Sequence, residues 1–273
     1  MKTILVPIDY SENSFNALHY AVNIAEHIKA KVVLFHVFEV PITTTEMPVI
    51  IMSPDQLEGM NNSKMNEIVK ELKEKHHIDI IVVSTPGYSV EEIVRKMNYL
   101  GADLTVLGIR GVSLISELVI GSVATGVIRK ANHPVLIVPE HAVFKVPTKI
   151  LFASDNSGVS NPATLNFLKE IASLFNCEVA IVNMIHKLEN AEQEALLAID
   201  YSSVLQGINT SYHQIEGEDI AESINDYLTT FDADIIVNIP RKHSFVENII
   251  HESNTKKLAF HTHIPLLALP DMD

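Results

Sequence analysis

The stretch KTILVPIDYS at residues 2–11 is repeated, with conservative changes, as TKILFASDNS at residues 148–157. Aligning Ile4 with Ile150 places Asp9 on Asp155 and Ser11 on Ser157. Two later segments also match, GADLTVLGIRG (101–111) with DADIIVNIPRK (232–242) and HPVLIVP (133–139) with IPLLALP (264–270). Such internal similarity predicts two copies of one structural unit. We expect one domain at 1–142 and another at 148–273.

Each copy alternates short apolar runs with helical patterns. In the first copy the runs are Ile4–Ile8, Val32–Val37, Ile78–Ser84, Leu104–Leu107 and Val135–Val138. Continuous apolar runs are typical of parallel strands buried on both faces. A helix is predicted after a cap at Ser11 in the first copy and from Asn161-Pro162 in the second. The pattern predicts an α/β fold with a doubly wound parallel sheet, in which ligands bind at the carboxyl ends of the strands.

Composition excludes several classes of protein. Apolar residues make up 47% of the 273, too many for intrinsic disorder, and the single cysteine, Cys177, excludes an internal disulfide framework. The excess of 34 acidic over 20 basic residues disfavours nucleic acid as a partner. The sequence shows neither a signal peptide nor an apolar stretch long enough to span a membrane. We therefore expect a cytoplasmic protein that binds neither a membrane nor nucleic acid.

The stretch GIRGVSLISELVIGSVATGVIRKANHPVLIVP (108–139) carries the strongest signal for a ligand site. Gly108 and Gly111 frame a turn after a predicted strand, and Gly121-Ser122 precedes a predicted helix. The first amide groups of that helix, on Ser122, Val123 and Ala124, have no intrahelical acceptor and lie at the positive end of the helix dipole. This arrangement suits an anion. The alternative is that the glycines only form turns and that Ser122 only caps the helix.

The spacing G-x₂-G-x₉-G-S, together with ILVPID at the start and LFHV at 34–37, resembles the nucleotide-binding signature of the universal stress protein family. The resemblance covers the whole chain as two tandem copies. It implies two Rossmann-like domains of the adenine nucleotide alpha hydrolase-like kind, each with a five-stranded parallel sheet flanked by helices. Many members of this family bind ATP. The chain is thus expected to be an ATP-binding regulatory protein of the stress response, with Mg²⁺ accompanying the nucleotide.

The resemblance also implies roles for individual residues. Asp9, with Pro7 beside it, would hold the ribose, and the backbone of Val37 would lie at the adenine edge. The phosphates would be lined by Gly108, Gly111, Gly121, Ser122, Val123 and Ala124, with Arg110 near the phosphate tail. For Asp9 the alternative is a role in capping the first helix. The segment 112–120 is expected to become ordered when phosphate binds, and the apolar last strands of the two copies are expected to pair within the chain, as an intrachain pseudo-dimer.

The second copy departs from the motif. Gly108, Gly111 and Gly121 align with Ile239, Lys242 and Glu252, so all three glycines are lost and a carboxylate replaces the third. We expect one nucleotide per chain, bound in the first domain. Two other functions stay open: a slow ATPase or autophosphorylating enzyme, although no catalytic residue is identified, and an interaction scaffold without nucleotide. No metal site is predicted, because five histidines of the second half (His213, His243, His251, His261 and His263) match no known ligand spacing. Sequence leaves open whether two chains form a homodimer.

Overall fold

The computed structural model describes residues 1–40, 52–110, 120–154, 161–185, 201, 203–216, 220–240 and 263–271. Strands and helices alternate along the first half, as predicted, and the described parts of the second half contain strands and helices in the same way. The first half contains β1 (Thr3–Ile8), α1 (Glu12–Ile28), β2 (Lys31–Phe38), α2 (Pro54–Lys73), β3 (Ile80–Pro86), α3 (Ser89–Leu100), β4 (Leu104–Gly108), α4 (Ser122–Lys130) and β5 (Val135–Val138). The second contains β6 (Lys149–Ser154), the 3₁₀ helix η1 (Pro162–Leu165), α5 (Asn166–Phe175), β7 (Glu178–Ile185), β8 (Asn209–Glu216), α7 (Ile220–Thr230), β9 (Ile235–Asn238) and β10 (Leu266–Ala268).

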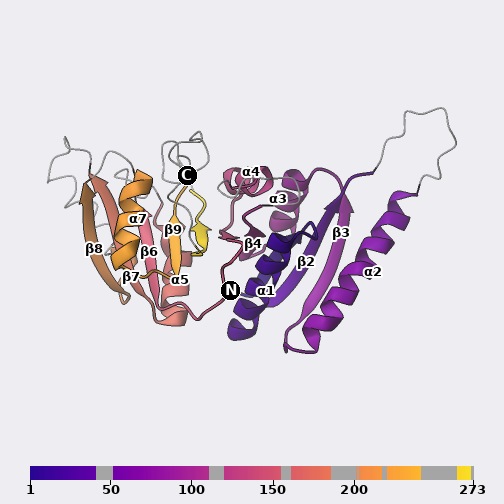
Figure 1. Ribbon diagram of the computed structural model, residues 1–273, viewed down its shortest axis with the longest axis horizontal. Coiled ribbons are helices and arrows are strands. Elements are labelled where there is room, and N and C mark those ends of the chain that lie inside the picture. The colour runs from indigo at the N-terminus through magenta and orange to yellow at the C-terminus, as the bar shows by residue number, and fades with distance from the viewer. Residues whose placement is uncertain are drawn as a thin grey trace.

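The described strands form one ten-stranded sheet in the order β3-β2-β1-β4-β5-β10-β9-β6-β7-β8. Each half contributes five strands that are parallel to one another, and the two sets meet at β5 and β10, which pair antiparallel. In that pair Leu267 lies opposite Leu136. The predicted pairing of the two apolar last strands is confirmed, and it leaves neither strand with an open edge. Figure 1 shows the halves side by side, with the amino terminus between them.

Helices cover both faces of the sheet, because alternate strand residues point to opposite sides. In β1, the side chains of Ile4, Val6 and Ile8 pack in one core with residues of α1 and α2, while Leu5 packs on the other side with residues of α3 and α4. All six residues of β1 are buried. The near-continuous apolar runs seen in the sequence thus reflect strands buried on both faces.

Strand register confirms the alignment of the two copies. Ile8 pairs with His36 in the first half, and Ser154 pairs with Asn183 in the second. The sequence repeat aligns Ile8 with Ser154, and the shared register makes His36 and Asn183 equivalent as well. The first two strands of the second half therefore keep the pairing of the first half but carry different side chains at this position.

A carboxylate clamp is repeated as well. Asp103 Oδ2 accepts hydrogen bonds from the amides of Lys2 and Thr3 at 2.8 and 2.9 Å. In the second half Asp234 Oδ2 accepts from the amides of Thr148 and Lys149 at 2.6 and 3.0 Å. Each clamp ties the start of the first strand of a half to the residue before that half's fourth strand.

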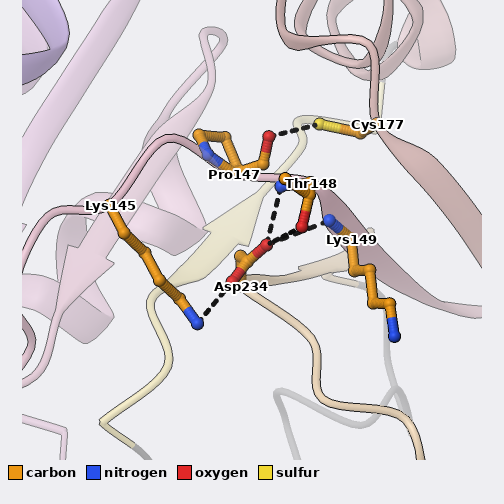
Figure 2. Close-up of polar contacts among 6 residues, drawn as sticks. All are labelled: Lys145, Pro147, Thr148, Lys149, Cys177 and Asp234. Carbon is orange, nitrogen blue, oxygen red and sulfur yellow. Dashed lines mark hydrogen bonds and ion pairs between the residues drawn. The ribbon is translucent and has the colours of Figure 1, made fainter.

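The Asp234 clamp also holds the segment that joins the two halves (Figure 2). Lys145 Nζ lies 2.6 Å from Asp234 Oδ1, and the Cys177 thiol donates to the carbonyl of Pro147 at 3.3 Å. Burial alone would raise the pKa of Asp234, but the bonds from Lys145, Thr148 and Lys149 outweigh it and lower that pKa. The junction is therefore built around an ionised, buried carboxylate.

Local signals place most boundaries where the sequence suggested. Ser11 caps α1, because its side chain accepts from the amide of Ser14. Several boundaries differ from the prediction, and the clearest differences concern the third strand and the first helix of the second half. The third strand begins at Ile80 instead of Ile78, and the helix expected from Asn161-Pro162 begins as a 3₁₀ turn before α5. Within the described part of the chain, no helix has both the length and the apolar character needed to cross a membrane.

Candidate functional site

A cavity of about 310 Å³ opens at the carboxyl ends of β1, β2 and β4. Its volume lies at the lower end of the range usual for small-molecule sites. The described lining residues are Pro7, Ile8, Asp9, Ser14, Val37, Ser89, Ile93, Leu107, Gly108, Arg110, Gly121, Ser122, Val123 and Ala124. They include nine of the ten site residues predicted from sequence. The tenth, Gly111, lies outside the described residues.

Asp9 occupies the turn between β1 and α1 and is exposed at the cavity wall. The amide and the hydroxyl of Ser11 donate to Asp9 Oδ1 at 3.1 and 2.5 Å. Tyr10, between them, has a φ of 65°, in the left-handed region that a tyrosine rarely adopts. Asp9 therefore supports the helix cap and lines the cavity at the same time, so its two predicted roles do not compete.

Behind the cavity wall, His36 is fixed against the end of β1. Its Nδ1 lies 2.8 Å from the carbonyl oxygen of Ile8, which can only accept, so Nδ1 carries the proton. Burial lowers the pKa of His36; the bond to Ile8 and the charge of Asp9 oppose this shift, and Lys64 adds to it. His36 is therefore a neutral hydrogen-bond donor that positions the next residue, Val37.

Val37 presents its backbone beyond the end of β1. Along β2, the amide of Lys31 donates toward β1 at 3.0 Å, and the amide of Val32 donates toward β3 at 2.8 Å. Polar backbone groups alternate in this way along a strand, so those of Val37 face the β1 side. Because the pairing with β1 ends at Ile8, the carbonyl of Val37 points into space that a ligand can occupy.

The amino end of α4 forms another part of the cavity wall. Gly121 is its N-cap, with no side chain to cap the helix, and Ser122, Val123 and Ala124 are its first three residues. The first turn of α4 contains no acidic residue, whereas its last turn contains Arg129 and Lys130. The first amide groups of α4, which have no acceptor within the helix, and the positive end of its dipole therefore face the cavity, and the helix itself places no carboxylate at this end.

Gly108 has a packing role that the sequence did not reveal. A Cβ at this position would lie 2.6 Å from the carbonyl oxygen of Asn13 and 3.1 Å from the amide nitrogen of Ser14. The missing side chain thus lets the end of β4 approach the first turn of α1. The equivalent residue, Ile239, is buried, and the helix of the second half begins later in the repeat, at Pro162.

Five lining residues were missed by sequence reasoning. Ile8 and Leu107 lie at the ends of their strands, and Ser14 is buried in the first turn of α1. Ser89 and Ile93, four residues apart in the first two turns of α3, belong to the helix that follows β3. The rule that ligands bind at the carboxyl ends of parallel strands pointed to all of them, but no glycine or charge marked them in the sequence.

Several predicted features lie outside the described residues. Among them are segment 112–120 except for Ile120, and in the second half Asp155, Lys242 and Glu252. Of the histidines weighed as metal ligands, only His213 and His263 are described. In the described ranges no three His, Cys, Asp or Glu side chains gather closely enough to hold a metal ion. Cys177 is buried, as expected for a structural thiol, and burial together with Asp234 raises its pKa to about 11.

Comparison with known proteins assigns the chain to a family. The family model described as "Universal stress protein family" matches residues 1–139, about half of the chain. The chain belongs to the universal stress protein family. Curated relatives support this: universal stress protein YxiE of Bacillus subtilis is 31% identical over 143 residues, and a universal stress protein of Methanocaldococcus jannaschii is 33% identical over 156. Each alignment covers 50% of this chain and 97% and 94% of the relative, respectively.

Solved structures extend the likeness in fold to both halves. A universal stress protein from Archaeoglobus fulgidus superposes with a TM-score of 0.75 at 19% identity, covering 99% of this chain and 98% of the other. A putative universal stress protein from Pseudomonas aeruginosa superposes with a TM-score of 0.59 at 12% identity, and the alignment covers 99% of this chain and 93% of that protein. The universal stress protein described here is thus a tandem, two-domain member with an α/β fold.

Proposed function

We propose that this universal stress protein binds one adenine nucleotide per chain, as Mg-ATP, in the cavity of its first half, and that it acts as a regulatory protein. The observation that carries the proposal is the amino end of α4. It faces a cavity lined by nine residues that the family motif marks for nucleotide binding. In this proposal the amides of Ser122, Val123 and Ala124 hold the phosphates, and Arg110 neutralises part of their charge.

The other end of the cavity suits the nucleoside. Asp9 can accept hydrogen bonds from ribose hydroxyls, as acids after the strands of such sheets do. The carbonyl of Val37 can accept one from an exocyclic amino group, which adenine carries. Asp9 is the one carboxylate among the described lining residues. Mg²⁺ would therefore be held mainly by the phosphates and water, as is usual for nucleotide-bound magnesium.

Binding without efficient turnover is the expected behaviour. Hydrolysis needs a group that takes a proton from, or orients, the attacking water. The described lining offers no histidine, glutamate or lysine, and Asp9 lies in the region assigned to the ribose. A slow ATPase or an autophosphorylating enzyme remains the second candidate. Its proposed phosphate acceptors are Ser122, which lines the cavity, and Ser116, which lies outside the described residues.

The one-nucleotide stoichiometry rests on the second copy of the motif. Ile239 replaces the first glycine, and Glu252 stands where the third would be. A carboxylate about 4 Å from a phosphate costs roughly 4 kcal/mol at an effective dielectric constant of about 20. The neighbouring Arg241, Lys242 and His243 offset only part of such a charge. Isothermal titration with Mg-ATP is expected to saturate at one nucleotide per chain, and saturation at two would overturn the assignment.

The phosphate site has a direct test with a matched control. Gly121→Glu puts a carboxylate at the amino end of α4 and should abolish ATP binding. Gly59→Glu makes the same change on the exposed surface of α2, where nothing lies within 4 Å of an added Cβ, and should leave binding intact. Unchanged ATP affinity in Gly121→Glu would refute the proposed site.

Analysis of nucleotide extracted from gently purified protein, with and without magnesium, separates the functional candidates. Bound ATP supports the proposal, bound ADP favours the slow ATPase, and protein that neither retains nor takes up nucleotide favours the interaction scaffold.

A further inference from the structure

Two helices direct their amino ends into the same cavity. Ser122 is the first residue of α4 and Ser89 is the first residue of α3, and both line it. The N-cap of α3, Tyr88, makes no side-chain capping hydrogen bond, and in the first turn the carboxylate of Glu91 accepts from its own amide. The hydroxyl of Ser89 has no hydrogen-bond partner among the described residues. The cavity therefore has hydrogen-bond donors at two separate places.

The charges around the two helix ends differ. The first turn of α3 contains Glu91 and Glu92, whereas the first turn of α4 contains no acid. Glu91 pairs with Lys130 at 2.7 Å, and Glu92 pairs with Arg95. These carboxylates already occupy the positive end of the α3 dipole, and a triphosphate placed there would be repelled by them. The end of α3 thus suits an uncharged acceptor, and the end of α4 suits the anion.

The surroundings of Ser89 fit a flat, uncharged ring. Val37, Ile93 and Leu107 supply apolar walls to the same cavity. The amide of Gly87 donates to the carbonyl of Phe38 at 3.0 Å, which fixes the approach to α3 against the end of β2. Ser89 is therefore held on the side of the cavity where the Val37 backbone is exposed.

We propose that Ser89 is a base-binding residue: its hydroxyl, which lines the cavity at the start of α3, donates to an acceptor nitrogen of the nucleotide base. This inference rests on the proposed function and adds to it the residue that holds the base end. Donors at α3 complement the acceptor at Val37, so that the base is held by a donor and an acceptor together. Neither the glycine motif nor the predicted site includes Ser89.

The test compares two serines that begin two helices. Ser89→Ala and Ser122→Ala each remove one hydroxyl from the first position of a helix in the same cavity. Affinities for adenosine, which has no phosphate, and for Mg-ATP are measured by isothermal titration for both variants and for the wild type. One neutral hydrogen bond corresponds to about a two- to tenfold change in affinity.

Ser89→Ala is expected to lower the affinities for adenosine and for ATP by the same factor, because the lost hydrogen bond is to the base. Ser122→Ala is expected to lower the affinity for ATP and to leave the affinity for adenosine unchanged. Ser89→Thr, which restores a hydroxyl, should recover most of the lost affinity, and circular dichroism shows whether each variant is folded.

A Ser89→Ala protein that binds adenosine as the wild type does, or that loses affinity for ATP alone, would overturn the inference while leaving the proposed function standing. If the wild type binds neither adenosine nor ATP, the proposed function fails, and the assignment of Ser89 fails with it.

Discussion

Gly126→Ala offers a sharp test of how the two cavity helices are spaced. Gly126 lies in α4 and faces Val90 in α3, the residue after Ser89. A Cβ at Gly126 would lie 2.8 Å from Val90 Cγ2 and 3.1 Å from Val90 Cγ1. A β-branched side chain in a helix has one strongly preferred rotamer, so Val90 cannot turn away without strain. The added methyl group must therefore push α3 and α4 apart.

Two opposing effects set the expected magnitude. Replacing glycine by alanine inside a helix stabilises it by about 1 kcal/mol. Inserting a methyl group into a filled space costs roughly 1–3 kcal/mol. We expect Gly126→Ala to lower the free energy of unfolding by about 1 kcal/mol in the wild-type background. In a Val90→Ala background the clash disappears, and the same substitution should stabilise the protein by up to about 1 kcal/mol.

Urea unfolding of the wild type, the two single variants and the double variant gives the coupling between the two positions. Gly59→Ala in α2 is the control, because nothing lies within 4 Å of its added Cβ and only helix propensity changes. Nucleotide titration should also show weaker ATP binding in Gly126→Ala, since the displaced α3 carries Ser89. The reasoning is refuted if Gly126→Ala stabilises the protein equally in both backgrounds.

Three further predictions concern residues around the cavity and the junction. Asp234→Asn should lower the free energy of unfolding at pH 7 by roughly 2–3 kcal/mol, more than Asp103→Asn in the less buried clamp of the first half. Because the pKa of Asp234 is lowered in the folded state, its contribution to the free energy of unfolding is present above about pH 4 and is lost as the pH falls through the folded pKa. Acid unfolding followed by circular dichroism should therefore show the curves of the wild type and of Asp234→Asn converging at low pH. Gly108→Ala should destabilise the protein by about 1–3 kcal/mol in thermal unfolding, because its Cβ would meet backbone atoms of α1; an unchanged melting temperature would contradict that packing. Cys177, with its pKa raised to about 11, should resist alkylation at pH 8 until urea unfolds the chain, and rapid labelling of the folded protein would count against its burial.

Much of this fold could be predicted from sequence, because the deciding signals are local or repeated. The apolar runs of β1 and β5 predict strands that are buried on both faces, and Ser11 predicts the start of α1. The internal repeat supplied the relation between the halves, which the matching pairs Ile8 with His36 and Ser154 with Asn183 confirm. The pairing of β5 with β10 followed from two apolar strands that would otherwise have an open edge.

The parts that sequence missed depend on contacts between distant segments. Gly108 was predicted to frame a turn and to line the site, and it lines the cavity, but its close packing against the backbone of Asn13, almost a hundred positions earlier, was not predictable. Ser89 carries no motif, and only the convergence of α3 and α4 brings it to the cavity. The repeat aligns Asp234 with Asp103, but only the structure places Lys145 and two backbone amides around the Asp234 carboxylate. Such roles arise from three-dimensional neighbours that no local pattern encodes.

The position of β10 at the centre of the sheet has a consequence for synthesis. While the chain emerges from the ribosome, the first half can fold as soon as β5 is available, but its edge stays unpaired until Leu266–Ala268 appears more than a hundred residues later. During that interval the nascent first half presents an apolar strand to any similar strand nearby, including that of another copy on the same messenger RNA. Slow translation of the second half should therefore favour assemblies in which two chains exchange this pairing.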